Sequence, residues 1–144
     1  MRRHDSLVSF ARDHHSALVV AIGLKRVGRG EAPLQLAAIR ALVVEWHDRL
    51  QQHFADEERL LPPLLTAEER SRLTSDHGQL RRVVEAAERQ LTCGTPDTGF
   101  CEAAGTLLEQ HIRWEDRELF ARIEIRASQE QLDELARQTS RRAG

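Results

Sequence analysis

Apolar residues recur along most of the chain at alternating steps of three and four positions, the spacing of one face of an α-helix. Three breaks divide this pattern: the stretch GRGEAP after Val27, the pair Pro62–Pro63, and the loop TCGTPDTG at 92–99. We predict long helices over about 6–27, 34–61, 66–91 and 100–126. No part of the sequence shows the strict alternation of a β-strand.

Two short motifs mark the starts of helices. Thr66 is followed three positions later by Glu69, and Ser128 by Gln131, which is the pattern of a capping box. The second box opens a short C-terminal helix. Long helices with short connections favour antiparallel neighbours. We therefore predict an all-α fold, an up-down-up-down antiparallel four-helix bundle with a short C-terminal helix, as a single domain over residues 1–144.

Composition narrows the classes of partner. Hydrophobic residues make up 40% of the 144 and charged residues 31%, the balance of an ordinary soluble domain. The formal net charge of −2 gives no basic footprint, so we expect no nucleic-acid partner. No apolar run approaches the length of a membrane span, and the N-terminal residues lack the apolar core of a signal peptide. We expect a cytoplasmic protein without a membrane partner.

Each of the four predicted inner faces is interrupted by a histidine. The faces are Val8, Ala11, His15, Leu18 and Ile22; Ile39, Val43, Trp46, Leu50, His53, Glu57, Leu60 and Leu64; Leu73, His77, Leu80, Val84, Ala87 and Leu91; and Ala104, Leu108, His111, Glu115 and Leu119. One buried histidine is usually satisfied by ordinary hydrogen bonds. Four of them, two with a glutamate one turn later, favour metal ligation, because a buried carboxylate without a partner is costly and metal ions bind imidazole and carboxylate together.

The two halves of the chain resemble each other. The segment His15-Ser-Ala-Leu matches His77-Gly-Gln-Leu, and the His53-to-Glu57 motif matches the one that begins at His111. Paired about a two-fold axis, the halves supply four imidazoles and two carboxylates. This set suits two metal ions, each bound by two histidines and bridged by the glutamates. Because it contains no thiolate, it favours iron, with manganese or zinc as possible substitutes.

The motifs at His15, His53, His77 and His111 together resemble the hemerythrin-like (HHE cation-binding) family. The resemblance covers roughly residues 15–123 and implies a four-helix bundle around an oxo- or hydroxo-bridged di-iron centre. It also implies a small-molecule ligand such as dioxygen, nitric oxide or peroxide. The sequence indicates no particular redox partner.

Two positions depart from the oxygen carriers of that family. Carriers have a further histidine on the third helix, where this chain has Leu73, so one metal would lack a protein ligand and be open to a small molecule. Carriers also place an aspartate five residues after the fourth-helix histidine, which is Asp116 here. Helical geometry favours Glu115, about 40° around the helix from His111, over Asp116 at about 140°. Asp116 stays the second candidate for this ligand.

Several alternatives remain open at this point. His14 competes with His15, because it lies on a second apolar face with Leu7 and Phe10. The match with His77 favours His15. Glu58 could orient a ligating imidazole through a hydrogen bond. The alternative hypotheses for the function are an iron-binding or iron-sensing module without catalysis, a metal-free helical interaction module, and a haem protein.

Overall fold

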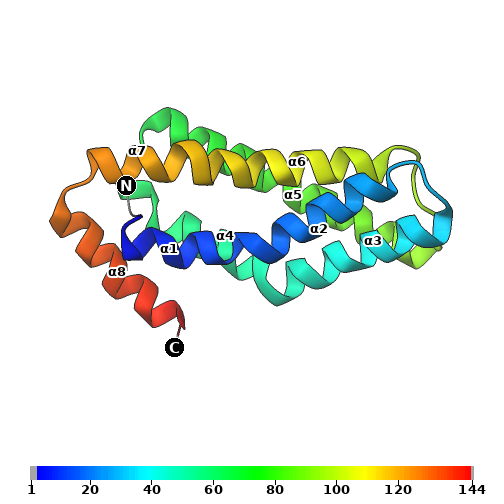
Figure 1. The fold of residues 1–144 in the computed structure, drawn as a ribbon, viewed down its shortest axis with the longest axis horizontal. Helices are drawn as coiled ribbons and strands as arrows, with labels where there is room; N and C mark the ends of the chain where they lie inside the picture. The colour runs from blue at the N-terminus through cyan, green and yellow to red at the C-terminus, as the bar shows by residue number, and fades with distance from the viewer. Residues whose placement is uncertain (1–2, 144) are drawn as a thin grey trace.

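Residues 3–143, which the computed structural model describes, form helices and short connections without a β-strand. Four long helical segments lie side by side along the molecule, and α8 lies at one end (Figure 1). The segments are α1 (Asp5–Arg12) with α2 (His14–Val27); α3 (Ala32–Glu45), the π-helical η1 (Trp46–Leu50) and α4 (Gln51–Leu60); α5 (Ala67–Cys93); and α6 (Phe100–Trp114), the π-helical η3 (Glu115–Leu119) and α7 (Phe120–Arg126). A 3-10 turn, η2 (Pro62–Leu64), precedes α5, and α8 spans Gln129–Ala143. The all-α prediction is confirmed.

Both predicted capping boxes are present. The backbone N–H of Glu69 donates to Thr66 Oγ1 at 3.2 Å, and the N–H of Thr66 donates to Glu69 Oε1 at 2.9 Å. Ser128 and Gln131 exchange the corresponding bonds at 2.8 and 3.1 Å. These bonds satisfy amide groups that have no partner within the first turn of a helix. They fix the starts of α5 and α8.

The long helices are less regular than the sequence predicted. The first segment is interrupted at Asp13, whose N–H bonds to the carbonyl of Phe10 at 3.2 Å. Two π-helical turns, η1 and η3, interrupt the second and fourth segments. Such turns are rare and are frequent at functional sites. Here η1 ends shortly before His53, and η3 begins at Glu115.

The first segment presents a different face to the core from the predicted one. The buried residues of α1 and α2 are Ser6, Leu7, Phe10, His14, Ala17, Ala21 and Leu24. Small residues on this face allow α2 to approach α6 closely, since a Cβ atom on Gly105 would lie only 2.6 Å from the carbonyl oxygen of Ala21. The match with His77 had favoured the neighbouring face, which carries His15. The close approach of α2 to α6 places His14 on the buried face instead.

Two apolar clusters fill the interior. One includes Leu24, Ile39, Val84 and Leu108 and packs α2, α3, α5 and α6 together. The other lies toward α8 and consists of Leu7, Phe10, Leu60, Leu61, Leu65, Leu73, Trp114, Leu119, Phe120, Ile123, Leu132 and Leu135. The four buried histidines lie along their helices between members of the two clusters. Apolar side chains therefore flank the site on both sides.

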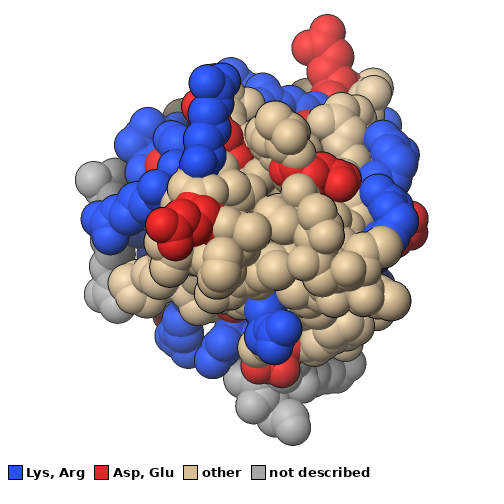
Figure 2. All heavy atoms as spheres, turned by 90° about the vertical axis from the view of Figure 1, so that its right-hand side faces the viewer, with Lys and Arg blue, Asp and Glu red and all other residues tan. Residues whose placement is uncertain are grey.

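The surface carries charges of both signs. Figure 2 shows the end of the bundle where α2 meets α3 and α5 meets α6; residues other than Asp, Glu, Lys and Arg fill most of its centre, and charged side chains gather at the rim. Among residues 3–143, none of the helices combines the length and low charge that a membrane span requires.

Candidate metal centre

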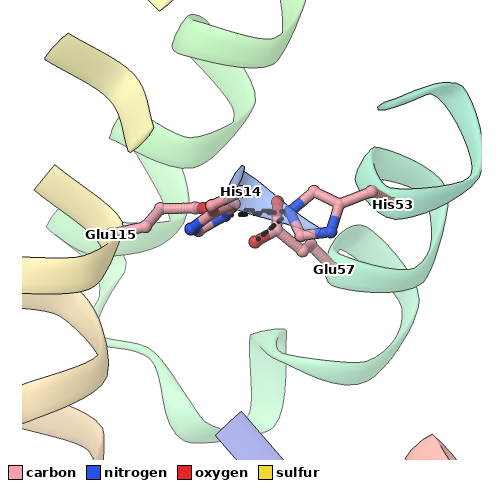
Figure 3. A group of neighbouring side chains, drawn as sticks. All are labelled: His14, His53, Glu57 and Glu115. Atoms are coloured by element: carbon pink, nitrogen blue, oxygen red, sulfur yellow. Dashed lines mark hydrogen bonds and ion pairs between the residues drawn. The ribbon is translucent and has the colours of Figure 1, made fainter. Parts of the chain in front are cut away.

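Four histidines and two glutamates converge in the middle of the bundle from all four helical segments. They are His14 of α2, His53 and Glu57 of α4, His77 of α5, His111 of α6 and Glu115 of η3. None is more than 2% exposed. Figure 3 shows four of them, with the two imidazoles and the two carboxylates directed at a common point between the helices. Buried polar groups at this density need partners.

The six residues form two overlapping groups of four. His14 and His53 belong to one group, and His77 and His111 to the other. Glu57 and Glu115 belong to both. Within each group, one potential ligand atom of every residue lies within 4.8 Å of the others. The arrangement offers two neighbouring cation positions that share two carboxylates.

Each glutamate directs one oxygen to each group. Glu57 places Oε2 3.2 Å from His53 Nε2 and Oε1 3.1 Å from His77 Nε2. Glu115 places Oε1 2.8 Å from His14 Nε2 and Oε2 3.4 Å from His111 Nε2. A carboxylate with its oxygens divided in this way can bridge two ions. Bridging of two ions by these glutamates stays a prediction.

The outer nitrogen of every imidazole is paired with a carboxylate. The pairs, measured at Nδ1, are His14 with Asp116 (2.9 Å), His53 with Asp13 (2.9 Å), His77 with Glu58 (2.6 Å) and His111 with Asp76 (2.9 Å). Because a carboxylate can only accept, Nδ1 carries the proton in each pair. In the neutral imidazole, Nε2 then holds a lone pair directed into the centre. Metal-binding histidines are commonly oriented by such partners.

These outer pairs join different helices in a repeating order. Asp13 and Glu58 bond to histidines on the next segment along the chain, and Asp76 does the same. Asp116 closes the ring by bonding back to the first segment. Four carboxylate–imidazole bonds therefore connect the four segments in a closed circle around the cluster.

Several inner atoms have no satisfactory partner within the described chain. Glu57 Oε2, His111 Nε2 and both carboxylate oxygens of Glu115 are buried without a hydrogen bond, although imidazole nitrogens lie nearby. His14 Nε2 and His53 Nε2 lie 3.2 Å apart, so two lone pairs face each other when both rings are neutral. Converging lone pairs and unpaired carboxylate oxygens are what a bound cation would satisfy. The residues present therefore fit a metal pair.

Without a metal, protons on the imidazoles compensate part of the negative charge of the buried carboxylates. Burial would lower the pKa of His14, but Asp116 and Glu115 outweigh it and raise the pKa to about 9. Burial likewise opposes protonation of His111, yet Glu115 and Asp76 raise its pKa to about 10. Burial would raise the pKa of Glu115, whereas His111, His14 and His53 hold it well below its usual range. Cations that bind here must displace protons.

The prediction that His15, rather than His14, faces the interior of the bundle was wrong. His15 is exposed and lies outside both groups, whereas His14 is buried within one of them. A signal for the correct register was present in the sequence: the pairs Asp13-His14 and Asp76-His77 are both Asp-His, and 63 positions separate them. Matching His15 to His77 through the leucine three residues later set the repeat one residue off. Ligation by any of these residues stays a prediction.

Asp116 does not reach the inner cluster. It lies on the outer side of His14, with a side chain 34% exposed, while Glu115 is fully buried. The second candidate for the bridging position is therefore corrected to an orienting role, as the angle around the helix from His111 suggested. Glu58 has the orienting hydrogen bond that was considered for it.

Other features of the site were missed. Asp13 and Asp76 were not recognised as partners of the imidazoles. Phe54 stacks on His77 with ring centroids 3.9 Å apart and an interplanar angle of 5°. Phe120 lies parallel to His14 at 5.9 Å. Neither the partners of Asp13 and Asp76, which lie on other helices, nor the ring stacking has a signal in the local sequence.

The donor set contains only nitrogen and oxygen. Neither group includes a cysteine; Cys93 is exposed and Cys101 is buried in the cluster with Leu24 and Ile39, and both are free thiols. Imidazole with carboxylate suits iron, manganese or zinc. Leu73 is 2% exposed and packs in the cluster toward α8, so it adds no ligand one turn before His77.

Comparison with known proteins agrees with this geometry. No curated protein and no solved structure matches the chain. The family model of the hemerythrin HHE cation binding domain matches residues 6–123. That range contains the six clustered residues and their four outer carboxylates. The chain therefore belongs to the hemerythrin HHE cation-binding family.

Proposed function

We propose that this protein holds a dinuclear non-haem metal centre, with iron as the preferred metal, and reacts with a small molecule such as dioxygen, nitric oxide or peroxide. The observation that carries the proposal is the pair of overlapping His₂Glu₂ groups with shared, otherwise unsatisfied carboxylates. Manganese or zinc could occupy the same donors.

The ligands follow from the distances. His14 and His53 would hold one ion, and His77 and His111 the other, each through Nε2. Glu57 and Glu115 would bridge the two. Each ion then has four protein donors, fewer than the six that iron commonly takes. Positions remain for water or a small molecule on both ions.

The protein's own residues prepare this chemistry. Bound iron would supply redox and Lewis-acid reactivity at the vacant positions. The outer carboxylates keep the Nε2 lone pairs turned inward, and the flanking apolar clusters exclude bulk water. An up-down-up-down order of the four segments would bring ligands from all of them to one level, as the two-fold repeat requires.

Two alternatives differ in their use of the same residues. An iron-binding or iron-sensing module without catalysis would have the same ligands but no productive turnover. A metal-free helical interaction module would have to satisfy Glu57 Oε2 and both Glu115 oxygens with protonated imidazoles, which places several charges in the buried interior and costs stability. The unsatisfied atoms favour a metal-binding protein over the metal-free module.

Metal analysis tests the proposal directly. Protein reconstituted anaerobically with ferrous iron should hold about two ions per chain, and oxidation should give the near-ultraviolet absorption of a bridged ferric pair. His53→Ala and His111→Ala should each lose about half of the iron, because each histidine belongs to one of the two groups. His47→Ala is the control, because His47 is exposed and pairs with Glu88 on the surface. Reproducible binding of no more than one ion would exclude the dinuclear centre.

A further inference from the structure

We propose that a hollow beside His53 is the route by which the ion held by His14 and His53 exchanges with solvent, and that Arg72 and Trp114 close the corresponding place in the other half. The two ions should then differ in their rates of exchange. This inference rests on the proposed dinuclear centre and adds an order to its loading and release.

The hollow lies on the flank of the bundle and has a volume of about 240 Å³. Its lining consists of Ser9, Arg12 and Asp13 from the first segment and Asp48, Arg49, Gln52, His53 and Asp56 from the second. The hydrogen bond between Asp13 and His53 therefore borders the open space directly. His53 is otherwise buried, with 1% of its surface exposed.

The helix is interrupted at the same place. Asp13 stands between α1 and α2, outside both helices. Its counterpart Asp76 lies within α5, which is continuous over 27 residues. Backbone at a helix break opens more readily than backbone inside a long helix, because fewer hydrogen bonds must be broken. The carboxylate that orients His53 is thus on a less constrained element than the one that orients His111.

The internal repeat relates two residues that line this hollow to Arg72 and Trp114 in the other half. The separation of 63 positions that relates His14 to His77 also relates Ser9 to Arg72. The separation of 58 positions that relates His53 to His111 also relates Asp56 to Trp114. Ser9 and Asp56 therefore have a long and a large side chain as their counterparts, whereas Arg12 and Arg49 correspond to the shorter Ser75 and Leu107.

Those counterparts pack together. The guanidinium of Arg72 lies 4.5 Å from the ring centroid of Trp114, and its Nε is 3.6 Å from Asp76 Oδ2. The Trp114 ring lies 6.0 Å from that of His111 and is 4% exposed as a residue. A surface hollow next to this pair is lined by Arg72 and Trp114 but reaches neither His111 nor Asp76. The stacked pair separates His111 from the surface.

The remaining histidine of this half is covered as well. Phe54 stacks on His77, and Arg81 places its guanidinium 5.9 Å from the Phe54 ring while pairing with Glu58. His77 itself is fully buried. An ion between His77 and His111 can therefore leave only after larger rearrangements than an ion between His14 and His53. We expect the second ion to exchange more slowly.

Release of ferrous iron to a chromogenic chelator measures both rates. Protein loaded anaerobically and mixed with excess chelator should release its iron in two phases of equal amplitude. His14→Ala should abolish the fast phase, and His77→Ala the slow one. Circular dichroism of each variant checks that the helices are retained.

Reciprocal substitutions test the route itself. Ser9→Arg should fill the hollow and slow the fast phase by roughly tenfold, the effect of about 1.4 kcal/mol on a barrier. Arg72→Ser should uncover Trp114 and speed the slow phase by a similar factor. Ser71→Arg is the control for added charge, since Ser71 is exposed on α5 and does not line the hollow.

The outcomes separate the two levels of the proposal. A protein that binds fewer than two ions contradicts the dinuclear centre. Two ions released at one rate, a fast phase that survives in His14→Ala, or a fast phase unchanged by Ser9→Arg would overturn only the exchange route. Ser9 is half-buried on α1, so Ser9→Arg does not disturb a fully buried position. Ser9→Arg therefore tests the route even if Arg72→Ser fails to fold.

Discussion

Asp116 accepts a hydrogen bond from Nδ1 of His14 at 2.9 Å, although the two residues lie 102 positions apart. The adjacent Glu115 turns the other way and places Oε1 2.8 Å from Nε2 of the same ring. One imidazole is therefore held between two consecutive acidic residues of η3. The outer residue orients the ring, and the inner one shares its proposed ligand role.

Asp116→Asn should weaken metal binding without removing a ligand. Loss of the charged acceptor leaves the His14 ring less firmly oriented, and such outer partners typically contribute about 10- to 100-fold in metal affinity. The number of ions bound at saturation should stay the same. A ferrous iron titration measures both quantities. Glu115→Gln is the comparison, since loss of a bridging carboxylate should reduce the number of ions itself; equal titrations for the two variants would contradict the assigned roles.

His14→Ala and His15→Ala form a matched pair on one helix. His14→Ala should lose about half of the bound iron, because only one of the two groups contains this residue. His15→Ala should bind as the wild type does, because His15 is exposed. Iron content after gel filtration distinguishes the variants. Greater iron loss from the His15 variant, with the helices intact, would favour the register first predicted from the sequence.

Leu73→His should create a further ligand for the ion between His77 and His111. Leu73 lies one turn before His77 and is 2% exposed in an apolar cluster with Trp114. In metal-free protein the buried imidazole should cost about 1–3 kcal/mol, since polar groups buried without hydrogen bonds are unfavourable. Metal should recover this stability, so the gain in melting temperature on loading should exceed that of the wild type.

The same variant should change the reaction with oxygen. A further protein ligand fills a position that wild-type iron leaves to small molecules, so the reduced variant should react more slowly with dioxygen. We expect the wild type to react without forming a long-lived reversible adduct. Stopped-flow spectra after mixing with oxygenated buffer compare the two. Repeated binding and release of oxygen by the wild type, without oxidation of its iron, would instead indicate oxygen carriage.

The Glu69–Arg126 pair should make stability depend on acid pH. Burial would raise the pKa of Glu69, but Arg126 and the hydrogen bonds with Thr66 hold it below the ordinary value of 4.5. A carboxyl whose pKa is lower in the folded state stabilises above its unfolded pKa, and this contribution is lost as the pH falls through the folded value.

Glu69→Gln isolates this effect, because glutamine can keep the capping-box bond but not the charge pair. At neutral pH the metal-free variant should be less stable than metal-free wild type by about 0.2–1 kcal/mol, the usual range for a partly exposed ion pair. The difference should shrink below pH 4.5. Urea unfolding at both pH values tests this, and a difference that grows in acid would contradict the sign.

Helical periodicity predicted much of the fold, and particular residues show where it failed. Pro62 and the capping boxes placed the helix ends well, because their effects are local. The break at Asp13 and the π-helical turns were not predictable from apolar spacing, which tolerates a shift of one residue. His14 and His15 lie on equally plausible faces, and the close approach of α2 to Gly105 decides between them.

Most of the inner histidines and glutamates were easier to predict than the acids that orient them. His53 with Glu57 and His111 with Glu115 each lie on a buried face with a spacing of four residues. Their outer partners Asp13 and Asp76 come from other helices, so only the folded chain brings them together. Local spacing carries no information about which exposed acid will meet which ring.

The closed circle of carboxylate–imidazole pairs has the symmetry of two identical helical hairpins associated about a two-fold axis. Each hairpin would contribute an Asp-His pair on its first helix and a histidine, a glutamate and an outer acid on its second. Identical subunits related by such an axis must present identical surroundings to both ions. A single chain is free of that constraint, and Ser9 opposite Arg72 is a place where the halves differ. Because the two hairpins belong to one polypeptide, the half with His53 can border a surface hollow while the half with His111 is covered by Arg72 and Trp114.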